Sequence, residues 1–438
     1  MRPYEKYKQS GIDWIEQIPE DWEVRRVKDT VNKIGNGVTP LGGSSVYSDF
    51  GVPFLRSQNV YDNGLRINNV SFISDTIHNS MRNSSLKKYD ILINITGASI
   101  GRTCLVPESL EKANINQHIA FLRINTNNHF FISVFLKSQL IKDYIFSEQL
   151  GASKEAFNLS QIANIPLILP NDILQTKIAN YLDQKTTQID KKINLLGQKL
   201  SKYEELKKTL INETVCRGLD KNVELKESGV EWIGKIPKHW EVKRVKESLR
   251  KKITDGPHES PEFQDSGFPF LSVDGIVDGE LVFKNCRYID KDDYKRFSKK
   301  VKIERNDIFI GKAASIGKVA RVKVDFKFTV WSPIAVLKFN NKYSISYIEY
   351  FLKSNVVHNQ FETLCTTNTQ KNIAMKDIPK INILFPILFE QIQIANYLDE
   401  KCDKIDKIRA TIQKETALLK DFRKTLINDV VTGKVKIN

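Results

Sequence analysis

The chain has 438 residues, 41% of them hydrophobic, and a formal net charge of +15 at pH 7. No apolar run approaches the roughly 20 residues of a membrane-spanning helix, and the N-terminus is charged where a signal peptide is apolar. We therefore expect a cytoplasmic, globular protein of about two to four domains. The five cysteines include no Cys-x-x-Cys pair, which argues against a disulfide framework and a zinc site.

The positive charge favours nucleic acid as a partner, because a cytoplasmic protein this basic usually binds a polyanion. Lysine-rich helices that only solvate the surface would give the same net charge. Charge alone does not decide between these alternatives.

The chain contains two copies of one tryptophan-containing segment. "SGIDWIEQIPEDWEVRRVKD" begins at Ser10, and "SGVEWIGKIPKHWEVKRVKE" begins at Ser228. Later segments also recur, among them "ASIG", "FLKS", "IANYLD" and "TLIN". The period exceeds that of any solenoid repeat, so each copy is predicted to be a domain with its own core. The tryptophans of the opening segment are predicted to brace each domain by packing, with contact to a partner as the less favoured alternative: Trp14, Trp22, Trp232 and Trp240.

The first part of each copy has the pattern of a mixed α/β domain. Short apolar runs at 90–95, 119–124, 306–311 and 334–339 predict strands, and Gly, Asn and Ser turns separate them. Helices are fewer there, chiefly "FISVFLKSQLIKDYI" and "SYIEYFLKSNVVHNQF".

The second part of each copy predicts one long helix. Apolar residues recur there mostly every three or four positions, which is typical of a helix that packs against another helix along one stripe. These residues are Leu182, Ile189, Ile193, Leu196, Leu200, Tyr203, Leu206 and Leu210 in the first copy, and Leu398, Ile405, Ile408, Ile412, Leu419, Phe422 and Leu426 in the second. About 35 residues make a rod of roughly 50 Å.

We expect the two rods to pair antiparallel, as a coiled coil that joins the two domains under an approximate two-fold axis. In the alternative, each helix packs back on its own domain. The predicted fold class is α+β, with domain 1 at residues 1–175, helix 1 at 176–216, domain 2 at 217–390 and helix 2 at 391–438.

Catalytic motifs are missing. "GNGVTPLGG" lacks the third glycine of a dinucleotide loop, and the sequence has neither a Walker lysine nor the Asn-Pro-Pro-aromatic motif of amino-methyltransferases. The acid-x-Lys triplets at 224–226 and 399–401 are expected by chance in a lysine-rich chain. The six histidines have no spacing typical of metal ligands. We predict a protein with no catalytic residues and no metal.

The helix-entry segments carry a family resemblance. "IPLILPNDILQTKIANYLDQKTTQID" and "INILFPILFEQIQIANYLDEKCDKID", together with the duplicated tryptophan segment, resemble the DNA specificity subunit of type I restriction-modification systems over essentially the whole chain. The Pro-x-x-x-Glu-Gln segment at 386–391 is the most specific part. The first copy departs from it, with Leu174-Gln175 in place of Glu-Gln, which weakens any role for that Glu.

The resemblance implies two target recognition domains, joined by conserved helices, that bind a bipartite, asymmetric site in double-stranded DNA. It also implies methyltransferase and restriction subunits as partners, with S-adenosylmethionine, ATP and Mg²⁺ bound by those partners and no cofactor bound by this chain. The two-fold repeat offers two equivalent docking surfaces, so we expect two methyltransferase subunits. The alternative of another class is a non-catalytic helical scaffold whose basic charge is incidental.

Polar loop segments differ between the copies, and we expect these loops to read DNA. Arg and Lys side chains pair with guanine, Asn and Gln with adenine, and hydroxyl groups suit phosphate. The glycines of "ASIG" allow a tight turn beside phosphate. For any one residue, an ordinary solvated loop is the alternative. The predicted DNA-binding residues are Thr39, Ser44, Ser45, Tyr47, Arg56, Gln58, Asn59, Ser99, Arg102, Lys154 and Asn158 in the first copy, and His258, Asp274, Lys312, Ser315, Lys318, Thr367, Asn368, Gln370 and Lys371 in the second.

Overall fold

The computed structural model describes residues 2–125, 128–148, 156–313, 315–365 and 372–437. The chain forms two compact units: Met1–Leu196 with Lys414–Asn438, and Gly197–Gln413. Each unit therefore contains one mixed α/β part and segments of both long helices. In the described ranges, no helix has the length and apolar character needed to cross a membrane.

The first unit is built on two small sheets. An antiparallel sheet has the order β10-β9-β12-β4, and a second sheet has the order β11-β5-β8, with β11 parallel to β5. Every residue of β9 is buried, as its unbroken apolar sequence predicts. The strands of this unit are β1 (Tyr7–Ile12), β2 (Ile15–Pro19), β3 (Glu23–Arg26), β4 (Val31–Asn36), β5 (Val52–Leu55), β6 (Val60–Tyr61), β7 (Gly64–Leu65), β8 (Ser71–Ile73), β9 (Ile91–Asn94), β10 (Thr103–Leu105), β11 (Asn114–Ile115), β12 (Ile119–Ile124) and β13 (Pro166–Leu169).

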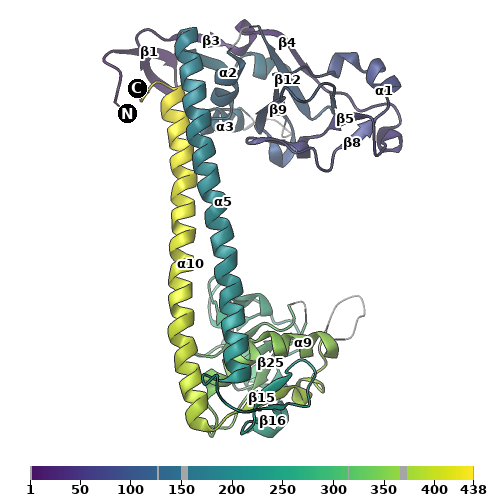
Figure 1. Cartoon of the computed structure of the whole chain (residues 1–438), viewed down its shortest axis with the longest axis vertical. Helices are drawn as coiled ribbons and strands as arrows, with labels where there is room; N and C mark the ends of the chain where they lie inside the picture. Colours follow the sequence, from purple (N-terminus) through teal and green to yellow (C-terminus); the bar gives the residue numbers. More distant parts are fainter. Residues whose placement is uncertain (1, 126–127, 149–155, 314, 366–371, 438) are drawn as a thin grey trace. The chain divides into compact units, whose positions relative to one another are not determined.

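Short helices cover this core: α1 (Asp75–Ser80), α2 (His129–Leu136), α3 (Gln139–Ser147) and α4 (Leu159–Ala163). The chain ends meet in the same unit, where Arg2 and Lys436 form a β-bridge and the Tyr7 hydroxyl donates to Gly433 O at 3.2 Å (Figure 1).

The second unit repeats this topology strand for strand. Its sheets have the orders β17-β25-β22-β23 and β21-β18-β24, and β24 is again parallel to its neighbour. The predicted duplication of a mixed α/β domain is thereby confirmed. The elements are β14 (Leu225–Glu227), β15 (Lys235–Pro237), β16 (Glu241–Arg244), β17 (Thr254–Asp255), β18 (Phe268–Leu271), β19 (Ile276–Val277), β20 (Glu280–Leu281), β21 (Arg287–Ile289), β22 (Ile308–Gly311), β23 (Val319–Arg321), β24 (Thr329–Val330), β25 (Ile334–Leu337) and β26 (Asn382–Phe385), with helices α6 (Val245–Ser248), α7 (Lys291–Lys300), α8 (Ile345–Leu352) and α9 (Asn355–Leu364).

The two long helices are α5 (Asp172–Arg217) and α10 (Leu388–Val431). They pair antiparallel within each unit, since Asp190 pairs with Arg423 in the first unit and Glu204 pairs with Arg409 in the second. The first unit's core contains Leu182 and Ile189 of α5 together with Leu426 of α10. The expectation of helix pairing is therefore confirmed (Figure 1).

The predicted apolar seam is too wide. Leu206, Ile408 and Phe422 are exposed, although all three continue the three-and-four spacing. A stripe of this spacing covers a broad face of a helix, whereas one partner helix contacts only its centre. Residues at the edge of the stripe are left in solvent.

The tryptophan segment braces each domain only in part. Trp22 and Trp240 are buried, and Trp22 packs edge-on against Tyr4 with the ring centres 5.7 Å apart. Trp14 stacks on Tyr144 at 5.2 Å. Trp232, in contrast, is exposed, so its predicted packing role is wrong.

Candidate nucleic-acid interface

Four loops of the first unit meet at one end of its strands. Asn94, at the end of β9, donates from Nδ2 to Ser57 O at 2.8 Å and to Ser99 Oγ at 3.0 Å, which joins the loops after β5 and β9. The loop after β4 is fixed by the Val38 N–H, which donates to Ile115 O at 3.2 Å. Sequence-predicted residues from distant segments therefore share one surface, which we call the loop cluster: residues 37–47, 56–59, 96–102 and 116–118.

Glycine allows the backbones to approach closely in this cluster. A Cβ at Gly37 would lie 2.0 Å from Ile115 O, and a Cβ at Gly256 would lie 2.0 Å from Val330 O in the second unit. Any larger residue would force the strands apart. The two copies thus use the same device to hold the loop against the parallel strand pair.

Within the loop cluster, Arg56 and Gln58 lie at the surface, whereas Asn59 lies inside. Asn59 is buried, its Oδ1 accepts from the Arg56 N–H at 2.9 Å, and its Nδ2 donates to Arg66 O at 2.8 Å. Both polar ends of this amide are used inside the loop, so Asn59 positions its neighbours. The Arg56 guanidinium lies 5.9 Å from the centre of the Tyr47 ring, and Gln58 is exposed.

A hydrogen-bonded chain of side chains crosses the loop cluster. The exposed Thr39 donates to Gln117 Oε1, Gln117 Nε2 lies 3.3 Å from His118 Nε2, and His118 Nδ1 lies 2.7 Å from Thr96 Oγ1. Sequence reasoning missed Gln117 and His118. The sequence indicates these two residues only by their position, because they are polar residues between two strands, β11 and β12.

The predicted hydroxyl residues occupy the outer part of the cluster. Ser44 and Ser45 are exposed, and Ser45 Oγ donates to Gly42 O at 2.7 Å.

Asn158 is also exposed, but its Oδ1 accepts from the Gln161 N–H at 2.9 Å and caps α4. Its carbonyl oxygen is therefore engaged, which leaves the amide nitrogen for a ligand.

The "ASIG" turns have the predicted left-handed glycines. Gly101 has φ 79° and Gly317 has φ 77°. Arg102, next in the chain, lies 4.7 Å from the centre of the Tyr61 ring, a cation–π contact that holds its guanidinium. Lys318 and Ser315 are half-buried at the matching turn of the second unit.

Asp255 collects three basic side chains in the second unit. Lys312 Nζ lies 2.5 Å from its Oδ2, Lys300 Nζ lies 2.9 Å from its Oδ1, and His258 Nε2 lies 3.3 Å away. Burial opposes the ionised carboxylate, but the hydrogen bonds and charges of Lys312 and Lys300 outweigh burial and hold the pKa of Asp255 below its ordinary value. Lys312 is itself buried, so its charge is neutralised by Asp255 inside the domain. His258 and Asp274, in contrast, are exposed.

Five of the predicted residues lie outside the described ranges: Lys154, Thr367, Asn368, Gln370 and Lys371. The described residues after each gap are anchored to the loop cluster or its counterpart. Ala156 bridges to Thr96, and Asn372 bridges to Ala313. Among the described residues, no group of three His, Cys, Asp or Glu is arranged to hold a metal ion.

The family described as type I restriction modification DNA specificity domain matches this chain twice, at residues 19–198 and 237–416. The chain belongs to this family. It is a specificity subunit, which is the non-catalytic, DNA-recognising component of a type I system. The resemblance stated from the sequence is confirmed.

Specificity subunits similar to this chain come from archaea and bacteria. The putative type I restriction enzyme MjaX specificity subunit of Methanocaldococcus jannaschii is 26% identical over 97% of this chain and 96% of its own length. The EcoKI specificity subunit of Escherichia coli is 25% identical over 46% of this chain and 44% of its own.

Solved structures share the fold. A chain from a study of complex assembly and conformational transition of the type I R-M system has a TM-score of 0.71 and 16% identity, with 95% of this chain and 99% of that chain covered. The HsdS subunit of Thermoanaerobacter tengcongensis has a TM-score of 0.54 and 17% identity, covering 95% and 98%.

The motif that carries the family resemblance positions the starts of the long helices of this specificity subunit. Gln391 donates from Nε2 to Pro386 O at 2.8 Å, and Gln175 donates in the same way to Pro170 O at 2.7 Å. Glu390 accepts from Trp240 Nε1 at 3.1 Å and lies 2.9 Å from His239 Nε2. The first copy has Leu174 in place of this Glu. A leucine side chain has no acceptor, so the corresponding hydrogen bond to the tryptophan is not formed.

Proposed function

We propose that this specificity subunit recognises a bipartite, asymmetric DNA sequence, with residues 30–160 reading one part and residues 250–375 reading the other. The observation that carries the proposal is that equivalent positions of the two copies hold side chains of different chemistry, although the strands and turns around them are the same. Arg56 directly precedes the short helix Ser57–Asn59 and Gln58 lies within it, and Ser272 and Asp274 take the same places at the short helix Val273–Gly275. A guanidinium and an amide pair with different bases than a hydroxyl and a carboxylate do.

Two copies in one chain increase specificity. Each mismatched base pair costs about 1–3 kcal/mol, roughly additively for separated positions, so two recognition domains discriminate far better than one. The different polar residues make the two parts of the site different in sequence. The site is therefore asymmetric although the fold is duplicated.

We further propose that two methyltransferase subunits and restriction subunits bind this chain, and that S-adenosylmethionine, ATP and Mg²⁺ are bound by those partners. An exposed apolar patch at the start of α10 supports a protein partner. The patch consists of Ile387, Leu388, Phe389 and Ile392, and Phe389 is 67% exposed. Apolar side chains gathered on an exposed surface mark protein–protein contacts. The counterpart positions hold Asn171, Asp172, Ile173 and Thr176, which are all exposed, and of these four only Ile173 is apolar.

The test is duplex binding by the complex of this chain with its methyltransferase subunits. The target is first found by mapping methylated adenines in DNA exposed to the complex. Binding to a target duplex and to a scrambled duplex of equal length is then measured from about 50 to 200 mM salt. We expect both affinities to fall steeply because counterions are released, with the target duplex bound more tightly at every salt concentration. Equal affinity for the two duplexes throughout would favour a scaffold with incidental charge.

A further inference from the structure

An aromatic cavity lies beside the proposed reading loop of the second unit. Phe270 is buried, and the half-buried rings of Phe263 and Trp331 have their centres 6.0 and 6.1 Å from the centre of its ring. The cavity has a volume of about 380 Å³, within the range of about 300–1,000 Å³ that is typical of small-molecule sites. Its wall includes these three rings and four polar residues: Ser272, Asp274, Lys284 and Arg287.

The polar groups of this wall are available to a ligand. Within the described ranges, the side chains of Ser272, Asp274 and Lys284 form no hydrogen bond or ion pair, and Asp274 and Lys284 are exposed. The Arg287 guanidinium lies 4.5 Å from the centre of the Phe263 ring, which holds a planar cation at the wall. The cavity thus combines aromatic surface with donors and an acceptor that the domain itself does not use.

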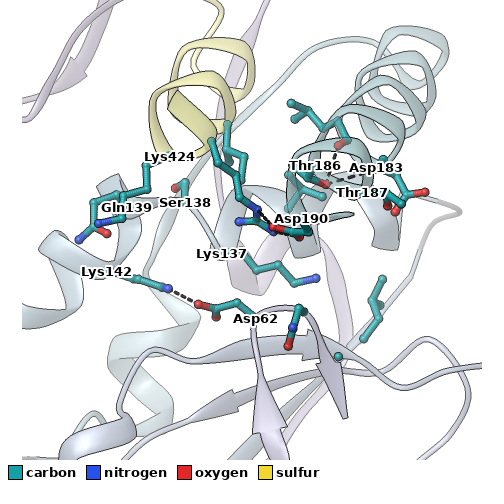
Figure 2. A pocket seen from close by; sticks show the side chains of 17 residues that line it. Asp62, Lys137, Ser138, Gln139, Lys142, Asp183, Thr186, Thr187, Asp190 and Lys424 are labelled. Carbon is teal, nitrogen blue, oxygen red and sulfur yellow. Dashed lines mark hydrogen bonds and ion pairs between the residues drawn. The ribbon is translucent and has the colours of Figure 1, made fainter. Parts of the chain in front are cut away.

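The cavities beside the long helices are different, because their acidic side chains already have partners. The cavity of the first unit has a volume of about 340 Å³, and Asp190 in its wall pairs with Arg423 at 2.9 Å. Figure 2 shows the ion pair of Asp62 with Lys142 in the same cavity. The corresponding cavity of the second unit, of about 620 Å³, is likewise lined by paired charges.

The first unit fills the place of the aromatic cavity with one of its own side chains. The Arg56 guanidinium lies 5.9 Å from the centre of the Tyr47 ring, and Arg56 Nε is buried. The second unit has Ser272 at the position of Arg56 and Trp331 at the position of Asn116. A serine side chain is too short to cover the ring below it. The exchange therefore opens a space in the second unit and adds an aromatic wall to it.

We propose that this cavity receives one base that has left the helical stack of the bound DNA. Aromatic rings and guanidinium planes are the surfaces on which unstacked bases pack. A base edge in the groove of an intact duplex does not reach a buried residue such as Phe270, whereas an extruded base enters a pocket of this kind. The role rests on the proposed function, because the second domain must first bind DNA.

Asp274 gives the cavity a preference among the bases. Its carboxylate accepts a hydrogen bond from an exocyclic amino group, which cytosine, adenine and guanine carry and thymine lacks. The exposed amine of Lys284 suits a phosphate that flanks the extruded base. The captured base is therefore an amino-bearing base in the part of the site that residues 250–375 read.

The experiment measures the affinity of the complex of this chain with its methyltransferase subunits for altered target duplexes. In each duplex, one base in the part read by residues 250–375 is removed, or its pairing partner is changed to give a mismatch. The pair that contains the methylated adenine stays intact, because a methyltransferase extrudes its own target base. At one position, we expect a mismatch to strengthen binding about threefold, since the base no longer has to be unpaired. Removal of the base at that position should weaken binding about tenfold, since its stacking is lost.

Two variants separate this site from the general effects of a mismatch. Trp331→Ala removes one aromatic wall, and Ser272→Arg fills the cavity as Arg56 fills its place in the first unit. Both variants should abolish the strengthening. The response to mismatches in the part read by residues 30–160 should stay as in the wild type, which is the matched control. Ser272→Arg keeps the test decisive if Trp331→Ala folds poorly.

The failure of this role differs from the failure of the proposed function. Preference for the target duplex without any strengthened position would overturn the capture of a base, and so would a strengthening that persists in Ser272→Arg. Equal binding of the target and scrambled duplexes would overturn the proposed function itself, and the role of the cavity with it.

Discussion

Arg423 of α10 and Asp190 of α5 form a two-pronged ion pair, with Nε 2.9 Å from Oδ1 and Nη2 3.1 Å from Oδ2. The second unit repeats this pair with the helices exchanged, since Lys207 of α5 lies 2.5 Å from Asp406 of α10. Both pairs are partly exposed and join the two helices beside a cavity. The duplication has therefore preserved a cross-helix contact whose direction reverses from one unit to the other.

Charge reversal at this contact should weaken the helix pairing in the first unit. We expect Asp190→Arg to lower the free energy of unfolding by about 1 kcal/mol, because it replaces a partly exposed attraction with repulsion. The double variant Asp190→Arg with Arg423→Asp should recover most of the loss. Urea denaturation of the single and double variants measures the coupling. Additive losses in the double variant would show that the two side chains do not interact.

The duplication, the central strands and the two long helices follow from the sequence because each is a local pattern. The buried strand β9 is an unbroken apolar run, and α5 has an apolar residue in nearly every turn. The contacts that decide which side chains face a ligand are not local. Lys312 and Asp255 are far apart in the sequence, and nothing near Lys312 indicates that its amine is buried on a carboxylate.

The same reason explains the errors at Asn59 and at the edge of the seam. Asn59 has the polar side chain of a base-reading residue, but its position inside a short helical turn consumes both ends of its amide. Leu206 continues an apolar pattern that the partner helix does not reach. A pattern gives the residue type at a position, whereas burial depends on what the fold places beside it.

Removing the Lys312 amine should destabilise the second unit in a pH-dependent way. The depressed pKa of Asp255 contributes stability that is fully present above the unfolded value of about 3.9 and is lost as pH falls through the folded pKa. We expect Lys312→Met to cost about 1–2 kcal/mol at pH 7 and clearly less at pH 3. Urea denaturation at both pH values measures this difference. An equal cost at the two pH values would mean that the pair with Asp255 is not its source.

The exposed patch on α10 should carry a methyltransferase contact. Phe389→Ala should weaken binding of a methyltransferase subunit about tenfold or more, since exposed aromatic anchors often dominate an interface, and should leave the Tm of the isolated chain unchanged. Ile173→Ala is the matched control at the counterpart position of α5.

Native mass measurement of the assembled complex gives the stoichiometry. We expect two methyltransferase subunits on the wild-type chain and fewer on the Phe389→Ala chain at low protein concentration. A fully active wild-type complex with a single methyltransferase subunit would contradict the proposed partners.

The long helices should set the spacer between the two parts of the DNA site. Four residues inserted near Gln198 in α5, matched by four near Lys414 in α10, add about 6 Å of rise and a little over one turn, so the apolar stripe stays nearly in register. We expect the spacer to lengthen by one or two base pairs, because B-form DNA rises about 3.4 Å per pair.

Two-residue insertions at the same places are the matched control. They rotate the stripe by about 200° and should abolish assembly. Mapping of methylated adenines distinguishes the outcomes. An unchanged spacer with the four-residue insertions, or full activity with the two-residue insertions, would show that these helices do not set the distance.

Mapping of methylated adenines, applied to variants of the reading loops, tests the central claim most directly. The variants are Arg56→Ala and Gln58→Ala in the first copy and Asp274→Ala at the position that matches Gln58. We expect the first two to relax base preference in one part of the site only, and the third to relax it in the other part only, with the spacer unchanged. Loss of preference in both parts equally, or in neither, would contradict the assignment of one recognition domain to each part.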